Sequence, residues 1–277
     1  MNSFSTLYKK HFKELLSPYG YKLYRSLFYR EVNQEQCFFI TAKKDRQYPF
    51  YKVYFGTLPY CMNLESELKE LNDIPDMLEF ELTSLIQQVA PELFSPETAE
   101  TYYESRLYAD YYDEEGTIDS LKNVCCDIKK YILPYLHQFT DLQYYYNEKN
   151  KKNSWNPTSP ERYALSLKFH KCEDTLNCIE YRSADCHRIM EHYTQVKDRL
   201  ESGKPSNVEK RILKKSPDYA ECVKRQISEY NEKIAEYETI RSNLLKKNFS
   251  HSDKMIAETE KRSRKYLINL MKNKSSN

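Results

Sequence analysis

Glycine occurs at only four positions, Gly20, Gly56, Gly116 and Gly203, which lie far apart in the sequence of 277 residues. Glycine lets backbone N–H groups approach a ligand closely and lets the chain adopt positive φ. The phosphate-binding loops of nucleotide-binding proteins need several glycines within a few positions. The sequence therefore predicts neither a Walker-type loop nor a dinucleotide-binding loop, and we expect no cofactor.

Large aromatic side chains supply much of the apolar surface of this chain. Its 26 tyrosines and 12 phenylalanines accompany 40% hydrophobic and 30% charged residues, which favours a folded protein over a disordered one. No apolar run reaches the roughly 18 residues of a membrane-spanning helix, and the first residues lack the pattern of a signal peptide. The eight cysteines form no C-x-x-C pair, as is typical of reduced thiols. We expect a cytoplasmic protein without a membrane segment.

The first third of the sequence predicts an α+β fold. Apolar residues recur with helical spacing over residues 3–17, and aromatic and β-branched segments at 23–32 and 37–42 flank a polar turn. A third strand is expected at 50–57. The predicted fold is an N-terminal helix packed on an antiparallel sheet.

Further elements follow this module. Helical spacing returns at 64–71 and 76–89, residues 102–112 are interpreted as a further strand, and a helix is expected over 117–133. Pro134 should end or kink that helix, because its ring cannot continue the hydrogen-bond ladder.

A polar segment over residues 148–160 predicts a linker between two domains. The α+β domain would span residues 1–150, and an all-α hairpin or bundle would span 158–277. A long helix at about 218–247 carries a heptad seam of Val223, Ile227, Tyr230, Ile234, Tyr237, Arg241 and Leu244. The seam predicts either an antiparallel hairpin with the last helix of the chain, at 253–271, or self-association.

Several residue patterns of the N-terminal domain resemble those of a known bacterial family. They are the segment Pro18-Tyr19-Gly20-Tyr21-Lys22, the strand Leu27-Phe28-Tyr29-Arg30, and a later strand ending on Phe55-Gly56. This combination resembles the domain of unknown function 4304 over roughly residues 4–147. The resemblance implies a soluble bacterial protein of the cytoplasm and brings no activity that can be carried over to single residues.

Acidic residues gather around Gly116, namely Asp110, Asp113, Glu114, Glu115 and Asp119. Clustered carboxylates hold divalent cations or form acid–base pairs, so a metal-dependent hydrolase is one interpretation. The alternative is an exposed turn that leads into a helix, where carboxylates interact favourably with the helix dipole. A second cluster, of cysteines and histidines over residues 170–192, has the wrong spacing for structural zinc, and we expect no metal site there.

The C-terminal part of the chain is basic. Residues 204–277 hold 18 basic and 10 acidic side chains, whereas residues 1–203 hold 25 and 31. The candidate partner contacts are Lys261, Arg262, Arg264, Lys265 and Tyr266. This pattern favours an acidic protein surface or nucleic acid as the partner, although a solvated helix face has the same composition.

Arg30 stands between Tyr29 and Glu31 in a predicted strand. An arginine fork among aromatic rings can hold a carboxylate, so Arg30 is a candidate pocket residue beneath the first helix. The alternatives are an internal salt bridge and a cation–π contact.

Taken together, the sequence favours a non-enzymatic protein-interaction module, with immunity-like or defence-accessory function as a specialisation that depends on analogy. The two alternatives are a nucleic-acid-binding protein that uses the basic C-terminal helices and a metal-dependent hydrolase that uses the carboxylates of Asp110–Asp119.

Overall fold

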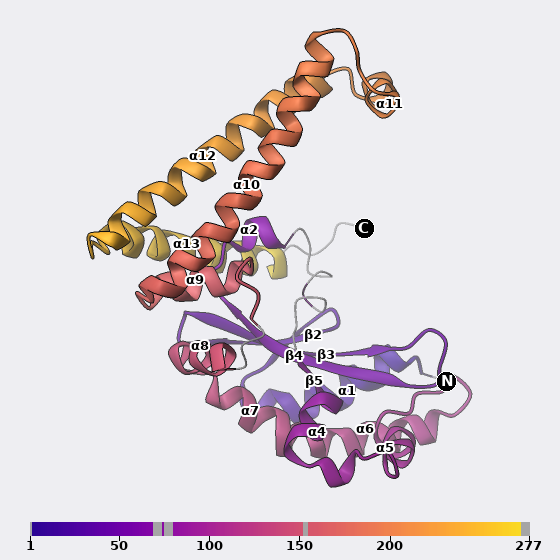
Figure 1. The fold of residues 1–277 in the computed structure, drawn as a ribbon. Coiled ribbons are helices and arrows are strands. Elements are labelled where there is room, and N and C mark those ends of the chain that lie inside the picture. Colours follow the sequence, from indigo (N-terminus) through magenta and orange to yellow (C-terminus); the bar gives the residue numbers. More distant parts are fainter. Residues whose placement is uncertain (1, 69–73, 75–79, 152–154, 273–277) are drawn as a thin grey trace. The chain divides into compact units, whose positions relative to one another are not determined.

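A computed structural model describes residues 2–68, 74, 80–151 and 155–272 and confirms the α+β fold with a helical C-terminal region (Figure 1). The chain divides into two compact units. The N-terminal unit comprises residues 1–148 together with 258–277, and the helical unit comprises residues 149–257.

The N-terminal unit contains a five-stranded antiparallel sheet in the simple order β1-β2-β3-β4-β5. The strands are β1 (Lys22–Tyr24), β2 (Leu27–Val32), β3 (Gln36–Lys44), β4 (Tyr51–Pro59) and β5 (Phe80–Glu81). The predicted hairpin and third strand are thus confirmed, but the segment at 23–32 is not one strand, because the chain turns between Tyr24 and Leu27 and pairs β1 with β2. β5 was not predicted, because residues 76–89 have helical spacing. Of the helices predicted at 64–71 and 76–89, residues 69–71 and 76–79 lie outside the described residues. The register of β5 places Phe80 opposite Phe55, and the two rings stack with centroids 5.5 Å apart.

One face of the sheet is covered by helices of the same unit, as Figure 1 shows below the strands. In α1, the Ser3 side chain accepts a hydrogen bond from the Thr6 N–H, and Tyr8 and Phe12 are buried against Phe28 of β2. This cap and this apolar stripe are why the segment forms a helix where predicted. The helical elements of this part of the N-terminal unit are α1 (Phe4–Leu16), the 3₁₀ turn η1 (Ser17–Tyr19), α4 (Leu82–Val89), the 3₁₀ turn η3 (Pro91–Leu93), α5 (Ala99–Arg106), α6 (Glu114–Asp127) and α7 (Leu133–Gln138).

A π-helical turn over Ile128–Ile132 joins α6 to α7. The Leu133 N–H donates to the Ile128 carbonyl, which is the wide bonding pattern of such a turn. Pro134 lies in the first turn of α7 and has no N–H to donate. Pro134 therefore does not end the helical path, which continues to Gln138.

Residues 102–112 do not form the predicted strand. Residues up to Arg106 belong to α5, and only a single bridge between Phe50 and Tyr108 joins the segment to the sheet. Tyr102 is 2% exposed, and its hydroxyl donates to Asp127 of α6 at 2.9 Å. The helical conformation places this ring against α6, which outweighs the strand propensity of its neighbours.

The opposite face of the sheet is covered by α2 (Leu64–Glu67) and by the part of α13 (Ser250–Lys272) that follows Ala257. The β3 residues from Gln36 to Ala42 are all buried, as expected for a central strand with both faces covered. The predicted domain 158–277 therefore needs a correction, because its last residues, from Glu258, belong to the N-terminal unit. Ser263 accepts a hydrogen bond from the Leu64 N–H and donates one to the Met62 carbonyl, and Tyr266 donates one to the Leu68 carbonyl. These three hydrogen bonds hold this end of α13.

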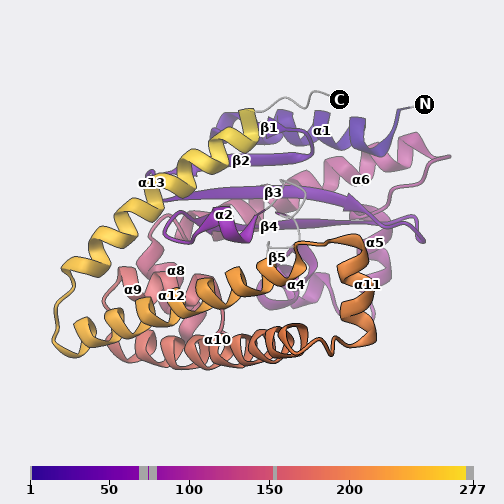
Figure 2. The same ribbon diagram turned by 90° about the horizontal axis from the view of Figure 1, so that it is seen from above.

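The helical unit is built around two long antiparallel helices, α10 (Cys172–Glu201) and α12 (Tyr219–Leu245), which lie side by side in Figures 1 and 2. The seam of α12 is buried at Val223, Tyr237 and Leu244, and it faces α10 rather than the last helix. Ile240 is buried and Arg241 is exposed, so the seam drifts by one position from the predicted heptad, as a straight helix requires.

Polar contacts close both ends of this helix pair. At one end, α11 (Asn207–Lys215) begins with a capping box formed by Ser206 and Glu209, and Glu209 also binds Arg199 of α10. At the other end, Arg162 of α9 (Pro160–Lys168) binds Asp174 of α10 through a largely buried ion pair. The remaining helix, α8 (Leu142–Lys151), spans the division between the units.

Candidate functional site

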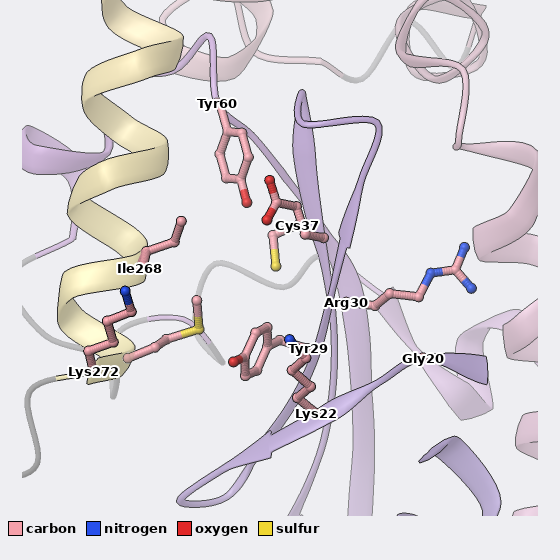
Figure 3. Close-up of a pocket in the computed structure, with 10 residues that line it drawn as sticks. Gly20, Lys22, Tyr29, Arg30, Cys37, Tyr60, Ile268 and Lys272 are labelled. Atoms are coloured by element: carbon pink, nitrogen blue, oxygen red, sulfur yellow. The ribbon is translucent and has the colours of Figure 1, made fainter. Parts of the chain in front are cut away.

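Arg30 lies on the face of β2 that is opposite to Tyr29 and Glu31, and Figure 3 shows its guanidinium pointing away from Cys37 and Tyr60. Its Nη1 donates to the Tyr19 carbonyl at 3.1 Å. The guanidinium also lies over the rings of Tyr21 and Phe38, at 5.7 and 5.8 Å from their centroids. The cation–π interpretation of Arg30 is therefore confirmed.

Arg30 also lines a cleft of about 430 Å³, which we call the Arg30 cleft. Its floor includes Phe38 of β3, and one wall comes from the π-helical turn and α7. The side chains of Tyr21, Arg30, Phe38, Lys129, Leu136 and His137 are among those that line the cleft. The sequence predicted a pocket beneath the first helix, whereas the described lining of this cleft comes from residues 19–38 and 129–137 and includes no residue of α1. Lys129 and His137 were missed, because only the fold brings residues 129–137 beside β2.

A second cavity of about 220 Å³ lies on the other face of β2 (Figure 3). Ile268 and Lys272 of α13 line it from one side, and Cys37 and Tyr60 from the other. Cys37 is fully buried, and burial raises the pKa of its thiol. This thiol is therefore held in its protonated form, which is a poor nucleophile and a poor metal ligand.

The carboxylates around Gly116 serve the local backbone. Asp113 caps α6 by accepting a hydrogen bond from the Gly116 N–H at 2.9 Å, and Asp110 accepts one from the Tyr112 N–H at 2.9 Å. Glu114 accepts two hydrogen bonds from Asn2 at 2.8 Å, which lower the pKa of its carboxyl.

Glu115 is exposed in the first turn of α6, and Asp119 pairs with Lys122 at 2.9 Å. Among the described residues, no group of three or more such side chains is arranged to hold a metal ion. The turn-and-cap interpretation of the acidic cluster thus has direct support, and the hydrolase alternative gains none.

The five basic-tail candidates separate into two groups. Arg264 binds Glu31 of β2, and the Tyr266 hydroxyl donates to the Leu68 carbonyl at 2.6 Å, so both side chains are engaged within the N-terminal unit. Lys261, Arg262 and Lys265 are exposed. Of the predicted partner contacts, only these three present their charge to solvent.

The cysteines and histidines of residues 170–192 are also dispersed. His170 stacks on Phe249 and pairs with Asp253 at 2.7 Å, whereas His187 contacts the Ser183 carbonyl. Cys178 and Cys186 are buried in α10, two turns apart on that helix.

A surface of exposed tyrosines was missed by the sequence analysis. Tyr48, Tyr111 and Tyr112 are 63%, 67% and 87% exposed, and we call them the tyrosine patch. Two backbone hydrogen bonds of 2.8 Å, from Tyr51 to Leu107 and from Ala109 to Pro49, place the two tyrosine-bearing segments side by side. The adjacent pair Tyr111-Tyr112 next to Asp110 and Asp113 was the signal in the sequence that could have identified this surface.

None of the described helices has both the length and the apolar character of a membrane span. No family model matches the chain, and neither the curated proteins nor the solved structures contain a match. The resemblance to the domain of unknown function 4304 remains a prediction, and the function has to be argued from the surfaces described above.

Proposed function

We propose that this protein is a non-enzymatic protein-interaction module of the bacterial cytoplasm, with immunity-like or defence-accessory function as its specialisation. The observation that carries the proposal is the tyrosine patch. Its rings at positions 111 and 112 contact each other edge to face at 5.3 Å between centroids, and both remain largely exposed. Tyrosine is enriched among the residues that dominate binding energy at protein interfaces.

Three features of the patch suit a protein partner. Tyrosine offers a large amphipathic contact area and loses little side-chain entropy on binding. The patch lies on a turn and a loop that are fixed by hydrogen bonds to each other, so ordering them costs little. Asp110 and Asp113 stand beside Tyr111 and Tyr112 in the chain, which favours a partner with a basic surface.

The test is affinity purification from the native cytoplasm with three forms of the full chain. These are the wild type, a Tyr111→Ser/Tyr112→Ser double variant, and a Tyr181→Ser control. Tyr181 is 52% exposed on α10, so the control removes an exposed ring elsewhere. We expect a partner protein to co-purify in stoichiometric amount with the wild type and with the Tyr181→Ser control. This partner should be absent when the double variant is used.

The binding constant of the purified partner should then weaken by at least about 10-fold in the double variant, because each lost tyrosine contact at the centre of an interface costs 1 kcal/mol or more. Recovery of the same proteins with all three forms would contradict the proposal. Thermal unfolding of the variants must match that of the wild type, since the substituted rings are exposed.

Nucleic-acid binding is the second candidate function, and it relies on the exposed side chains of Lys261, Arg262 and Lys265. These residues lie on α13, where their charges would contact phosphates rather than read bases. The test uses a variant in which Lys261→Gln, Arg262→Gln and Lys265→Gln are combined. Binding of the wild-type protein to duplex DNA at low salt that is lost in this variant would support nucleic-acid binding. Negligible binding at low salt would exclude it, because counterion release is most favourable there.

A further inference from the structure

The Arg30 cleft combines apolar walls with basic side chains. Its apolar lining consists of Tyr19, Leu133 and Pro134, which are partly or largely exposed, and of Tyr21, Phe38 and Leu136, which are buried beneath them. Its basic groups are Arg30, Lys129 and His137, and no carboxylate side chain of the described part of the chain lines it. A volume of about 430 Å³ falls within the range of small-molecule sites.

Arg30 is held in place before any ligand arrives. The hydrogen bond to the Tyr19 carbonyl uses one Nη1 donor, and the rings of Tyr21 and Phe38 lie against the guanidinium. The fork of an arginine carries five N–H donors, which match the two oxygens of a carboxylate. A guanidinium fixed in this way loses little further entropy when it binds an anion.

The backbone next to the cleft is also unusual. Lys129 belongs to the π-helical turn over Ile128–Ile132, and His137 lies in α7, directly after that turn. Turns of this kind are rare, occur mostly within α-helices and are frequent at functional sites. Here the π-helical turn itself supplies Lys129 to the cleft, and α7, which follows it, supplies His137.

We propose that the Arg30 cleft binds a small organic carboxylate with an apolar body. The carboxylate would pair with the Arg30 fork, with Lys129 and His137 adding positive charge, and the body would lie against Tyr19, Leu133 and Pro134. This site is separate from the tyrosine patch, so it goes beyond the proposed function and does not depend on it. The apolar lining disfavours inorganic anions, which have no body to bury.

Isothermal titration calorimetry of the full chain tests the proposal with phenylacetate, indoleacetate and isovalerate as probes. Phenylacetamide is the neutral control, and inorganic phosphate is the control for a bare anion. We expect at least one carboxylate to bind with a dissociation constant below about 1 mM. Its amide and phosphate should bind at least about 10-fold more weakly, since the amide lacks the charge that pairs with the fork.

Arg30→Gln should weaken the carboxylate by about 10- to 100-fold, the range expected for a lost hydrogen bond to a charged group. Arg30→Lys should restore only part of this loss, because lysine has no fork. Arg262→Gln, which removes an exposed arginine elsewhere, should change nothing. If Arg30→Gln does not fold, Lys129→Gln replaces it, since Lys129 is exposed, and a loss of about threefold is expected from a single exposed charge.

Three results would overturn the proposal. The first is that none of the three carboxylates binds, the second is that phenylacetamide binds as tightly as phenylacetate, and the third is that binding is equal in the wild type and in the folded cleft variants. The tyrosine-patch variant Tyr111→Ser/Tyr112→Ser should bind the carboxylate normally, which separates this site from the proposed interaction surface.

Discussion

Ser263 and Leu64, 199 positions apart in the sequence, are joined by a buried hydrogen bond of 3.1 Å from the Leu64 N–H to the Ser263 Oγ. The same hydroxyl donates to the Met62 carbonyl at 2.5 Å. One serine of α13 thus satisfies two backbone groups beside the sheet. This pairing explains why the end of α13 belongs to the N-terminal unit.

Ser263→Ala should destabilise the protein by about 1–2 kcal/mol. An unsatisfied buried backbone group costs about 1–3 kcal/mol, and the higher helix propensity of alanine offsets roughly 0.5 kcal/mol of this. Urea denaturation measures the change. Asn269→Ala, an exposed substitution on the same helix, is the control, and a cost for Ser263→Ala no larger than that of the control would contradict the contact.

Ile240→Ala and Arg241→Ala form a matched pair that tests the seam of α12. Ile240 is fully buried, so its truncation should cost about 2–5 kcal/mol of unfolding free energy. Arg241 is 56% exposed, and its truncation should stay within about 0.5 kcal/mol. Thermal or chemical unfolding of both variants gives the answer. Equal costs would favour the strict heptad that includes Arg241.

Glu209 should make the stability of the helical unit depend on pH. The hydrogen-bonded Arg199 side chain is the main cause that lowers the pKa of Glu209 to about 2, from an ordinary value of 4.5. A lowered pKa in the folded state means that the stabilisation is complete above about pH 5 and is lost as the pH falls towards 2. Urea denaturation between these pH values should show this loss.

The control for that prediction is Glu209→Gln, which cannot ionise. The variant should be less stable than the wild type at neutral pH, and the difference should shrink as the pH falls. Arg199→Gln should behave in the same way, because it removes the other partner of the pair. A difference that stays constant with pH would show that the ion pair does not set the pKa.

Gly20→Ala should destabilise the protein by about 1–2 kcal/mol, the cost of a left-handed conformation for a residue with a Cβ. Gly20 has φ 82°, and an added Cβ would meet only Arg30 Cδ at an ordinary distance of 3.7 Å. Gly203→Ala is the matched variant, because Gly203 has φ 69° and nothing within 4 Å. Similar costs in denaturation experiments are expected, and a much larger cost at Gly20 would reveal crowding of Arg30.

Local patterns predicted the elements that have strong local signals. The first helix has a serine cap and a regular apolar stripe, and it forms at Phe4–Leu16. The long helix expected at about 218–247 is observed at Tyr219–Leu245. The strand at 102–112 was wrong, since Tyr102 contributes to the core only from a helix that packs on α6.

The candidate sites follow the same division. The sequence made Arg30 a candidate pocket residue because an arginine fork among aromatic rings can hold a carboxylate. It could not identify Lys129 and His137, which lie about 100 positions away. The sequence predicted Arg264 and Tyr266 as contacts for a partner. In the structure they bind Glu31 and the Leu68 carbonyl, and the sequence alone could not show that these distant residues lie nearby.

The sequence by itself determined the α+β class, the positions of most helices and strands and the lack of a glycine-rich phosphate loop, because these depend on periodicity, caps and residue type within short windows. Only the tertiary structure decided that α12 packs on α10, that α13 ends in the N-terminal unit, and that Tyr48 lies beside the loop of Tyr111 and Tyr112. These features depend on contacts between distant segments, whose free energy comes from the complementarity of whole surfaces and not from any local pattern.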